Sequence, residues 1–368
     1  MRGTAALIKT ARRPKQLRVR IVFAASGRGL VQDADLLQEN LEYLGCAVER
    51  VATAPWSIRM TVLSHRYAEL KNRLPKFLGK ILDRLQVALL ALGKPHADLQ
   101  IHLESPVIGY IGAADINWLI PNQEWLRPQH LGFLTRIDQL LVKTVEGMTS
   151  LAPYHQRVNY FGFSNQIVDQ LSAVNEECGR FRRFLHVAGR NSKKGTVPIV
   201  EAWRRHPEWP PLILVVDDAS QFGSLPGNVV HQPKPDQLQL VALYRQCGVV
   251  LAPSEVEGFG HILVEGMAQQ GVVVTTDAAP MNELVTADRG YLVDWETQAP
   301  CHFGMRYFVT AEAVEAVIEQ ILETPDSLLL EKSLAARQWV LDNHRQFKRQ
   351  LAQQVETLIT KQPDSLRP

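Results

Sequence analysis

Short apolar runs alternate with segments of helical periodicity along almost the whole chain. The runs are apolar nearly throughout, which is typical of parallel strands that are buried on both faces of a sheet. They fall into two series, one before about residue 163 and one after it. The predicted strands are 18–24, 47–52, 99–103, 116–121, 138–142 and 157–161 in the first series, and 183–188, 212–216, 228–231, 248–252, 271–275 and 290–293 in the second.

Helical patterns occupy the intervals between these strands. They cover 33–44, 66–92, 166–178, 196–205, 236–246, 260–269 and 311–324, and a helical tail at 327–361 has no strand after it. This alternation of strand and helix predicts an α/β protein with parallel sheets that are covered on both faces. At 368 residues, the chain has the length of two doubly wound domains.

The composition is that of a soluble globular protein, with 46% hydrophobic and 21% charged residues. No apolar run is long enough for a membrane-spanning helix, and the basic first twenty residues lack the apolar core of a secretory signal. The four cysteines, Cys46, Cys178, Cys247 and Cys301, have no paired metal-ligand spacing. Because scattered cysteines suit a reducing compartment, we expect a cytoplasmic protein.

Charge is distributed unevenly along the chain. Residues 1–94 hold 17 Lys and Arg against 7 Asp and Glu, whereas the remainder holds 23 against 31. Within the basic part, segment 66–92 places basic residues between apolar positions at helical spacing. It is either a helix packed against its own sheet or a helix that lies on an anionic membrane surface. Nucleic acid is disfavoured as a partner, because the basic residues are not interleaved with stacking aromatics.

The densest set of candidate functional residues follows the strand predicted at 248–252. A turn with Gly258, Phe259 and Gly260 comes after this strand and opens a helix. Amides at the N-terminus of a helix attract anions, and glycine lets a phosphate or a sugar hydroxyl approach the backbone. The turn therefore predicts a binding site for an anionic ligand.

Two glutamates flank this turn, with seven residues between Glu257 and Glu265. A carboxylate there suits hydroxyl groups, because it can accept two hydrogen bonds from a vicinal diol. Residues 253–265 resemble the P-S-x-x-E-G-F-G-x-x-x-x-E signature of retaining glycosyltransferases of the GT-B fold, in the large family-4 group, and 271–285 continue the family's pattern. The resemblance implies that Glu257 contacts the donor sugar and that Glu265 binds the ribose hydroxyls of the nucleotide.

The same resemblance implies the domain organisation. A GT-B protein has two Rossmann-like domains that face a central cleft. Here residues 1–163 would form the acceptor-side domain and residues 164–339 the domain that binds the nucleotide sugar. Residues 340–368 would form a helix that crosses back to the first domain.

A second candidate element is the loop G-R-N-S-K-K-G at 189–195, directly after a predicted strand. Arginine and lysine beside glycines can hold a diphosphate, whose charge grows as the glycosidic bond breaks. Similar family members carry a G-R…K-G loop here, so the resemblance assigns Arg190 and Lys194 to the donor phosphates. The loop is one residue shorter than is common, which leaves Lys193 as an alternative to Lys194.

The N-terminal half resembles the family less. Gly27 and Gly29 follow the first strand, where relatives carry a glycine-rich loop near the donor diphosphate; a turn without a ligand is the alternative. His102 lies near the end of the strand at 99–103. It is either a side chain of the acceptor-side cleft or a hydrogen-bonded structural residue.

The main departure from the family comes after the strand at 116–121. Many relatives have a catalytic-site histidine there, whereas this chain has Asn122, Gln123 and Glu124. These three side chains could contact the acceptor or the donor sugar. Glu124 could equally be a surface residue.

Together these features predict a glycosyltransferase that moves a sugar from a nucleoside-diphosphate sugar to a glycan, lipid-linked or small-molecule acceptor with retention of configuration. Arg190, Lys194 and Glu257 are its expected catalytic residues. We expect no cofactor and no metal, because basic residues and a helix N-terminus take the place of a cation. The alternatives are an inactive sugar-nucleotide-binding module, and an epimerase or phosphorylase of the same fold.

Overall fold

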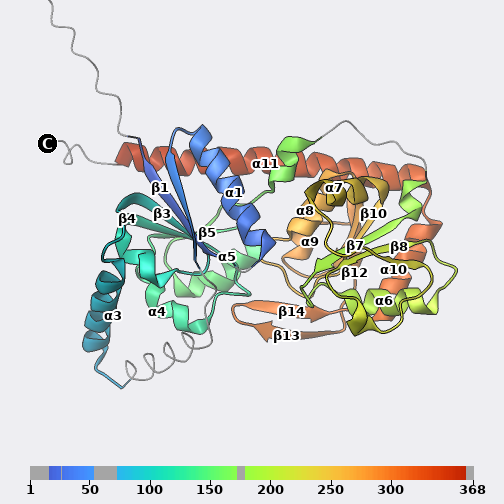
Figure 1. Ribbon diagram of the computed structural model, residues 1–368, viewed down its shortest axis with the longest axis horizontal. Helices are drawn as coiled ribbons and strands as arrows, with labels where there is room; N and C mark the ends of the chain where they lie inside the picture. The colour runs from blue at the N-terminus through green and yellow to red at the C-terminus, as the bar shows by residue number, and fades with distance from the viewer. Residues whose placement is uncertain (1–15, 26, 54–72, 172–178, 362–368) are drawn as a thin grey trace, which may run out of the picture.

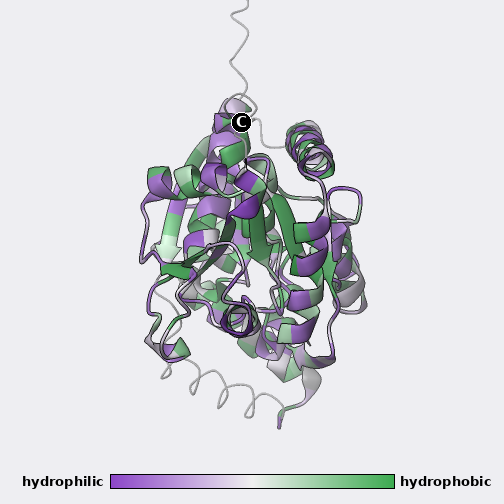
Figure 2. Ribbon diagram, turned by 90° about the vertical axis from the view of Figure 1, so that its right-hand side faces the viewer, coloured by the Kyte–Doolittle hydropathy of each residue, from purple (hydrophilic) through white to green (hydrophobic). Residues whose placement is uncertain are grey.

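The computed structural model describes residues 16–25, 27–53, 73–171 and 179–361. Its strands form two six-stranded parallel sheets, with helices on both faces of each, and one short antiparallel hairpin (Figure 1). The predicted α/β class with two doubly wound sheets is therefore confirmed. In Figure 2 the hydrophobic residues concentrate on the strands, as expected for sheets that are buried on both faces.

The first sheet has the strand order β2-β1-β3-β4-β5-β6, and every neighbouring pair is parallel. Its core includes Ile21, Leu99 and Ile101, all fully buried. The strands are β1 (Arg18–Ala24), β2 (Ala47–Thr53), β3 (Ala97–Glu104), β4 (Ala114–Pro121), β5 (Gln139–Val142) and β6 (Val158–Tyr160); the helices are α1 (Arg28–Tyr43), α3 (Lys76–Ala91), α4 (Leu131–Leu134) and α5 (Val145–Leu151).

The second sheet has the order β12-β11-β10-β7-β8-β9 and is also parallel throughout. Val249, Val250 and Val272 lie in its core. The strands are β7 (Phe184–Gly189), β8 (Leu212–Val216), β9 (Val229–His231), β10 (Val249–Ala252), β11 (Val272–Thr276) and β12 (Gly290–Val293); the helices are α6 (Thr196–Arg205), α7 (Gln237–Gln246), α8 (His261–Ala268), α9 (Met281–Leu284) and α10 (Ala311–Glu323).

The strand orders place the two predicted donor loops side by side. In an open parallel sheet, ligands bind at the carboxyl ends of the strands where the strand order reverses. In the second sheet this point lies between β7 and β10, which neighbour each other although they are far apart in sequence. The loop 189–195 follows β7, and the loop 253–260 follows β10. The corresponding point of the first sheet lies between β1 and β3.

The last helix, α11 (Asp326–Lys361), runs along both sheets (Figure 1). It is continuous, so residues 340–361 are the second part of one helix rather than a separate element. Its Phe347 ring lies 5.3 Å from the rings of Phe161 and of Phe163, at the end of the first domain. Gln139 of β5 donates a hydrogen bond to Gln354 at 3.2 Å. These contacts hold the second part of α11 against the first domain.

Several segments differ from their predictions, and the short helices α4, α5 and α9 were not predicted. Helix α1 begins at Arg28, five residues before the predicted start at 33, and a helical turn at Gln166–Gln170 replaces the start of the helix predicted at 166–178. A hairpin of β13 (Thr297–Cys301) and β14 (Gly304–Phe308) was not predicted. Two parts of the predicted helices lie outside the described residues: 172–178 of the helix predicted at 166–178, and 66–72 of the helix predicted at 66–92.

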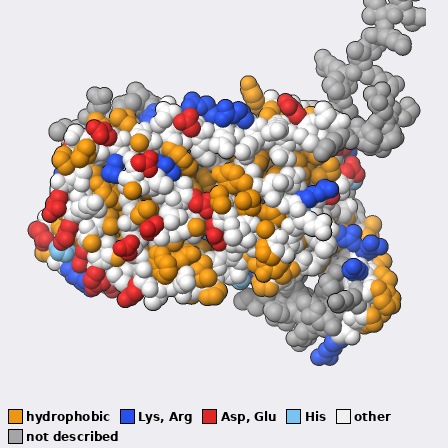
Figure 3. Space-filling view, turned by 180° about the vertical axis from the view of Figure 1, so that it is seen from behind, with side chains coloured by type: hydrophobic (Ala, Val, Ile, Leu, Met, Phe, Trp, Pro, Cys, Tyr) orange, Lys and Arg blue, Asp and Glu red, His pale blue; other side chains and the backbone are white. Residues whose placement is uncertain are grey.

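Helix α3 buries one side and exposes an apolar and basic one. Val87 packs with Ile108 and Ile111 of the adjoining turn. On the exposed side, apolar side chains lie among basic ones, and Figure 3 shows such side chains side by side at its lower right. The exposed fractions are 62% for Phe77, 46% for Ile81, 55% for Leu85 and 65% for Leu89, and Lys80 and Arg84 are exposed as well.

Candidate active site

The two predicted donor loops form one packed surface. The amide of Glu255 donates a hydrogen bond of 2.9 Å to the carbonyl of Lys193 in the neighbouring loop. Gly195 has a left-handed φ of 70°, and a Cβ there would lie 2.2 Å from the carbonyl oxygen of Pro253. Only glycine allows this approach, since any side chain would collide with backbone. The glycine that ends the basic loop therefore joins it to the loop that carries Glu257.

Lys194 and Glu257 are paired. Lys194 Nζ lies 2.5 Å from Glu257 Oε1, and their side chains are 16% and 9% exposed. An ion pair with little solvent around it is stronger than one at the surface. The structure therefore brings together a cation predicted to bind the donor phosphates and the carboxylate predicted to bind the donor sugar.

The glycine turn before α8 lies against residues of the first domain. Gly260 begins the helix with a left-handed φ of 103°. A Cβ on Gly258 would lie 2.6 Å from Asn122 Oδ1 and 2.8 Å from Glu124 Oε1, both of the first domain. The Phe259 side chain is buried, and its ring lies 5.4 Å from the ring of Phe163.

Glu265 lies in α8 and accepts three side-chain hydrogen bonds. Its Oε1 accepts hydrogen bonds from Gln32 at 2.9 Å and from Asn165 at 3.2 Å, and its Oε2 accepts one from the Tyr244 hydroxyl at 3.0 Å. Burial and the neighbouring carboxylate raise the pKa of Tyr244 well above its ordinary value, so the phenol keeps its proton. Gln32 comes from α1 of the first domain. Any ribose on Glu265 would share or replace these donors.

A buried ionic chain next to Glu265 was not predicted from the sequence. Asp33 accepts from Lys143 Nζ at 2.5 Å and contacts His261 Nε2 at 2.7 Å, and its side chain is 1% exposed. Burial acts to raise the pKa of Asp33, but Lys143 and His261 outweigh it and hold that pKa below its ordinary value. Asn165 Nδ2 lies 3.0 Å from His261 Nδ1 and so connects this chain to Glu265.

The glycine-rich loop of the first domain faces the cluster of Asp33, Lys143 and His261. Gly27 precedes α1 in an extended conformation, with open space around its Cα. A Cβ on Gly29 would lie 3.6 Å from the His261 ring. The loop thus lies at the start of α8, although its contact with a donor diphosphate stays a prediction.

Gln123 and Glu124 are buried, and Asn122 beside them is half-buried. Asn122 Oδ1 accepts from Lys143 Nζ at 3.0 Å, and the Gln123 carbonyl accepts from the Phe303 amide at 3.1 Å. Glu124 is 4% exposed, so it is not a surface residue. Burial raises the pKa of its carboxyl to about 8, and the charge of Glu257 adds to the effect.

His102 does not occupy a place where an acceptor could reach it. Its side chain is fully buried in the first sheet. Nδ1 accepts from the Val107 amide at 3.0 Å, and Nε2 lies 3.2 Å from Asn117 Oδ1. Burial lowers its pKa to about 4, so the ring is neutral. The cleft prediction for His102 is wrong for this structure, and the structural alternative holds.

Arg190 does not join the cluster either. Its side chain is 84% exposed, and its Nε lies 3.6 Å from Asp217 Oδ2 at the end of β8. Lys193, the alternative to Lys194, lies over the Trp125 ring of the first domain at 4.3 Å. Of the three basic residues in the loop, Lys194 is the one paired with Glu257. The phosphate role of Arg190 would require its side chain to turn in from solvent.

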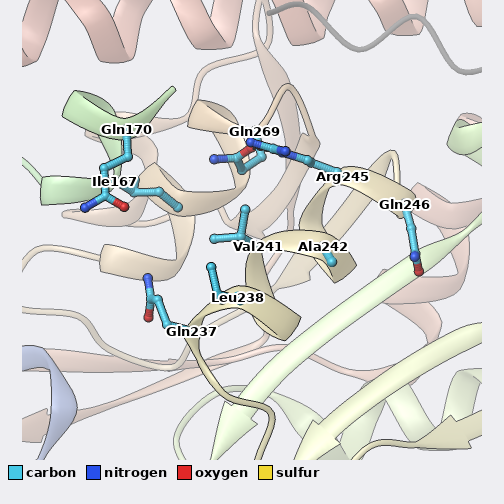
Figure 4. A pocket seen from close by; sticks show the side chains of 9 residues that line it. All are labelled: Ile167, Gln170, Gln237, Leu238, Val241, Ala242, Arg245, Gln246 and Gln269. Atoms are coloured by element: carbon cyan, nitrogen blue, oxygen red, sulfur yellow. Dashed lines mark hydrogen bonds between the residues drawn. The ribbon is translucent and has the colours of Figure 1, made fainter. Parts of the chain in front are cut away.

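A separate hollow of about 420 Å³ lies between α7 and the turn at Gln166–Gln170 (Figure 4). Its lining includes Ile167, Leu238 and Val241, and Arg245 donates a hydrogen bond of 3.1 Å to Gln269 at its edge. None of the predicted donor residues lines it. Among the described residues, no group of three metal-ligating side chains is close enough to hold an ion.

Residues 173–321 match the family described as glycosyl transferases group 1. This match covers the second sheet together with both predicted donor loops. This part of the chain is therefore similar to the group 1 glycosyl transferases. No curated protein sequence matches the chain significantly.

Solved structures show that the fold is GT-B. A sucrose-phosphate synthase from Thermosynechococcus elongatus aligns with a TM-score of 0.65 at 15% identity, over 94% of this chain and 100% of that one. A glycosyltransferase from Rickettsia africae aligns with a TM-score of 0.62 at 14% identity, over 95% and 100%. Anabaena Alr3699/HepE, in complex with UDP-glucose, aligns with a TM-score of 0.59 at 15% identity, over 94% and 100%.

Proposed function

We propose that this protein is a retaining glycosyltransferase, which transfers a sugar from a nucleoside-diphosphate sugar to an acceptor. The observation that carries the proposal is the convergence of two loops at the point where the second sheet reverses its strand order. One loop supplies Lys194, the other supplies Glu257, and the two side chains are 2.5 Å apart. The match of the second domain to group 1 glycosyl transferases supports the same activity.

Three elements of the proposed site bind different parts of the nucleotide-sugar donor. Glu265 binds the ribose hydroxyls, and the amides of the turn at 258–260 bind the diphosphate together with Lys194. Glu257 binds a hydroxyl of the donor sugar. A ribose diol can take the positions on Glu265 that Gln32 and Asn165 occupy in this structure, because all of these groups donate to the same oxygens.

The proposed chemistry is a front-face displacement. The bond from the anomeric carbon to the β-phosphate oxygen breaks, and the acceptor hydroxyl attacks from the same face while its proton passes to the departing phosphate. Negative charge grows on that phosphate, so preorganised positive groups stabilise the transition state more than the ground state. Lys194 and the N-terminus of α8 supply this charge, and we propose that neither a metal nor a cofactor is needed.

The donor and the acceptor are proposed by class. Anabaena Alr3699/HepE is described in complex with UDP-glucose, and a Staphylococcus aureus TarM variant in complex with UDP. UDP-sugars are therefore the first donors to test. The acceptor is a glycan, a lipid-linked sugar or a small molecule, on the side of the first domain.

We further propose that the exposed side of α3 contacts an anionic membrane surface. Apolar side chains at 77, 81, 85 and 89 lie beside Lys80 and Arg84, the combination that binds a headgroup region. Within the described part of the chain, no helix is both long and apolar enough to cross a bilayer. The proposed contact is peripheral and suits a lipid-linked acceptor at the cytoplasmic face.

Titration calorimetry with UDP and other nucleoside diphosphates tests the nucleotide site. Glu265→Gln should weaken binding by about 1.5–3 kcal/mol, the scale of a hydrogen bond to a charged group. Glu201→Gln is the matched control, because Glu201 is exposed on α6 of the same domain. Equal affinities for all three proteins would remove the ribose role of Glu265. Proton NMR of the first product then reports whether the anomeric configuration is retained.

An inactive sugar-nucleotide-binding module is the second candidate function. The observation that favours it is the pair of departures in the active site, namely the absence of the family's histidine and the outward position of Arg190. Release of the nucleoside diphosphate from a bound nucleotide sugar separates the two functions. A module would bind the donor and release nothing, whereas a transferase also hydrolyses it slowly. An epimerase would return a changed nucleotide sugar, and a phosphorylase would need inorganic phosphate.

A further inference from the structure

The side chain of Glu124 has no place in the machinery described above. It follows β4 at the carboxyl end of the first sheet, in the interval where the family's histidine is missing. Its Oε1 lies 2.8 Å from the position of a Cβ on Gly258, next to Glu257. The carboxyl group therefore lies in the first domain, directly opposite the loop proposed to hold the donor sugar.

The hairpin β13–β14 closes this position from solvent. A Cβ on Gly304 would lie 3.3 Å from Glu124 Cβ, and Cys301 Sγ lies 3.5 Å from the Glu124 carbonyl oxygen. Phe303 at the hairpin tip packs against the Tyr154 ring at 4.9 Å. The side chain of Glu124 is thus enclosed by both domains and the hairpin.

One oxygen of this enclosed carboxyl is unsatisfied. Glu124 Oε2 is buried and has no hydrogen-bond partner. Buried polar atoms in folded proteins are nearly always hydrogen-bonded, so an orphan at a proposed ligand site points to a group that the ligand supplies. The orphan oxygen belongs to the carboxyl group whose other oxygen faces Gly258, the residue directly after Glu257.

The surrounding charges decide which form of the carboxyl is present. Burial is the main cause that disfavours the charged form, and Glu257 and Glu104 add to it. The hydrogen bond from the backbone of Glu124 itself and the charge of Lys143 favour the charged form but are outweighed. Lys143 is committed to Asp33, and Lys194 is committed to Glu257. With its pKa raised to about 8, Glu124 holds its proton at neutral pH and so offers one O–H donor and one carbonyl acceptor.

We propose that Glu124 is a specificity-determining residue, which recognises one hydroxyl of a neutral transferred sugar by donating a hydrogen bond from its carboxylic acid. The inference rests on the proposed function. A buried site that hydrogen-bonds a hydroxyl discriminates strongly against analogues that lack it, because the protein group is then left unpaired. A donor with that hydroxyl removed is therefore a poor substrate, and so is a sugar that carries a carboxylate there.

The protonation state is tested first, without any substrate. Infrared difference spectra of the full chain, recorded between pH 6 and pH 10, should show a protonated-carboxyl band that disappears as the pH passes about 8. The band should be absent from Glu124→Gln and present in Glu104→Gln, the control for a neighbouring half-buried carboxyl whose pKa is also raised by burial. A Glu124→Gln spectrum identical with that of the wild type would overturn the proposal, whatever the enzyme's activity.

The hydroxyl contact is tested by the pH dependence of donor turnover. Wild-type kcat/KM should fall about tenfold per pH unit above pH 8, because Glu124 then loses the proton that it donates to the sugar hydroxyl. Glu124→Gln should keep activity within about tenfold and lose this decline, because its amide still donates, whereas Glu124→Ala should lose roughly 10- to 100-fold. The deoxy donor that wild type rejects should be rejected no longer by Glu124→Ala.

Two results would contradict this role. If Glu124→Gln is as inactive as Glu124→Ala and wild-type activity rises through pH 8, Glu124 acts as an ionised base. If all three proteins have the same donor preference, Glu124 does not read the sugar. A wild-type chain that turns over no nucleotide sugar would overturn the proposed function and the sugar contact with it, while the infrared result decides the protonation state on its own.

Discussion

Replacing Lys143 with methionine should destabilise the protein strongly. Lys143 and Asp33 are paired at 2.5 Å, and their side chains are 2% and 1% exposed. Methionine fills similar space without a charge, so Lys143→Met leaves the Asp33 carboxylate buried and still in contact with His261 but without its lysine partner. Lys143 also donates to Asn122 Oδ1, which would lose this bond.

The expected loss is about 3–5 kcal/mol, because breaking a buried ion pair from one side leaves an uncompensated charge. The matched control is Lys348→Met, which removes a pair with Asp169 whose side chains are 41% and 31% exposed. An exposed pair contributes about 0–1 kcal/mol. In the double variant Asp33→Asn/Lys143→Met no charge is left unpaired, so we expect it to recover part of the loss.

The effect should depend on pH. The pKa of Asp33 is held below its ordinary value of 3.8, so this carboxylate stabilises the wild type above that pH and stops doing so only as the pH falls through its folded value. Without Lys143 the burial of Asp33 acts to raise its pKa. Relative to the wild type, the Lys143→Met variant should therefore lose more stability at pH 8 than at pH 5.

Urea unfolding followed by tryptophan fluorescence measures these differences, and the transition of the first domain is the one to compare if the domains unfold separately. A Lys143→Met variant no less stable than Lys348→Met would refute the reasoning. So would a double variant whose loss equals the sum of the two single losses, because additivity means that the two groups do not interact.

Three other outcomes are expected. Glu124→Gln should gain stability over wild type by about 1.4 kcal/mol per pH unit between pH 4.5 and about 8, because the unfolded chain loses the proton that folded Glu124 keeps; parallel urea midpoints across that range would contradict it. Lys194→Met should lower kcat by roughly 100- to 1000-fold in nucleotide release, and Arg190→Met by less because Arg190 is exposed; the opposite order would reassign the phosphate ligand. The wild type should sediment with anionic but not with neutral vesicles, and Phe77→Ser/Ile81→Ser should not; equal sedimentation of both proteins would exclude the α3 contact.

Most elements of the fold were predictable because their signals are local. The strands at 212–216 and 290–293 and the helix at 196–205 were predicted with the bounds that the structure has. The start of α1 was not, because its N-cap residue is Gly27, which has no side chain to cap the helix. The hairpin was missed as well. It contains Pro300, which argues against a strand, and it is supported by contacts with the first domain rather than by its own sequence.

The site was predictable only where its residues are close in sequence. Glu257 and Glu265 lie within one loop and helix, so their spacing was enough to single them out. Lys143 and His261 are 110 and 228 residues from Asp33, and nothing in the sequence pairs them. Burial could not be predicted from the sequence either. His102 lies near the end of a strand and Arg190 follows one, yet His102 is enclosed in the sheet and Arg190 faces solvent.

Release of nucleoside diphosphate from a panel of nucleotide sugars is the most direct test of the proposed activity. With the wild type and with the control Glu201→Gln, we predict release from one preferred donor, accelerated by the correct acceptor. Glu257→Gln should still bind that nucleotide in calorimetry but release it at least about a hundredfold more slowly, because it loses a charged contact to the reacting sugar. If all three proteins release every nucleotide at the same background rate, with and without added acceptors, the protein is not a glycosyltransferase that works through Glu257.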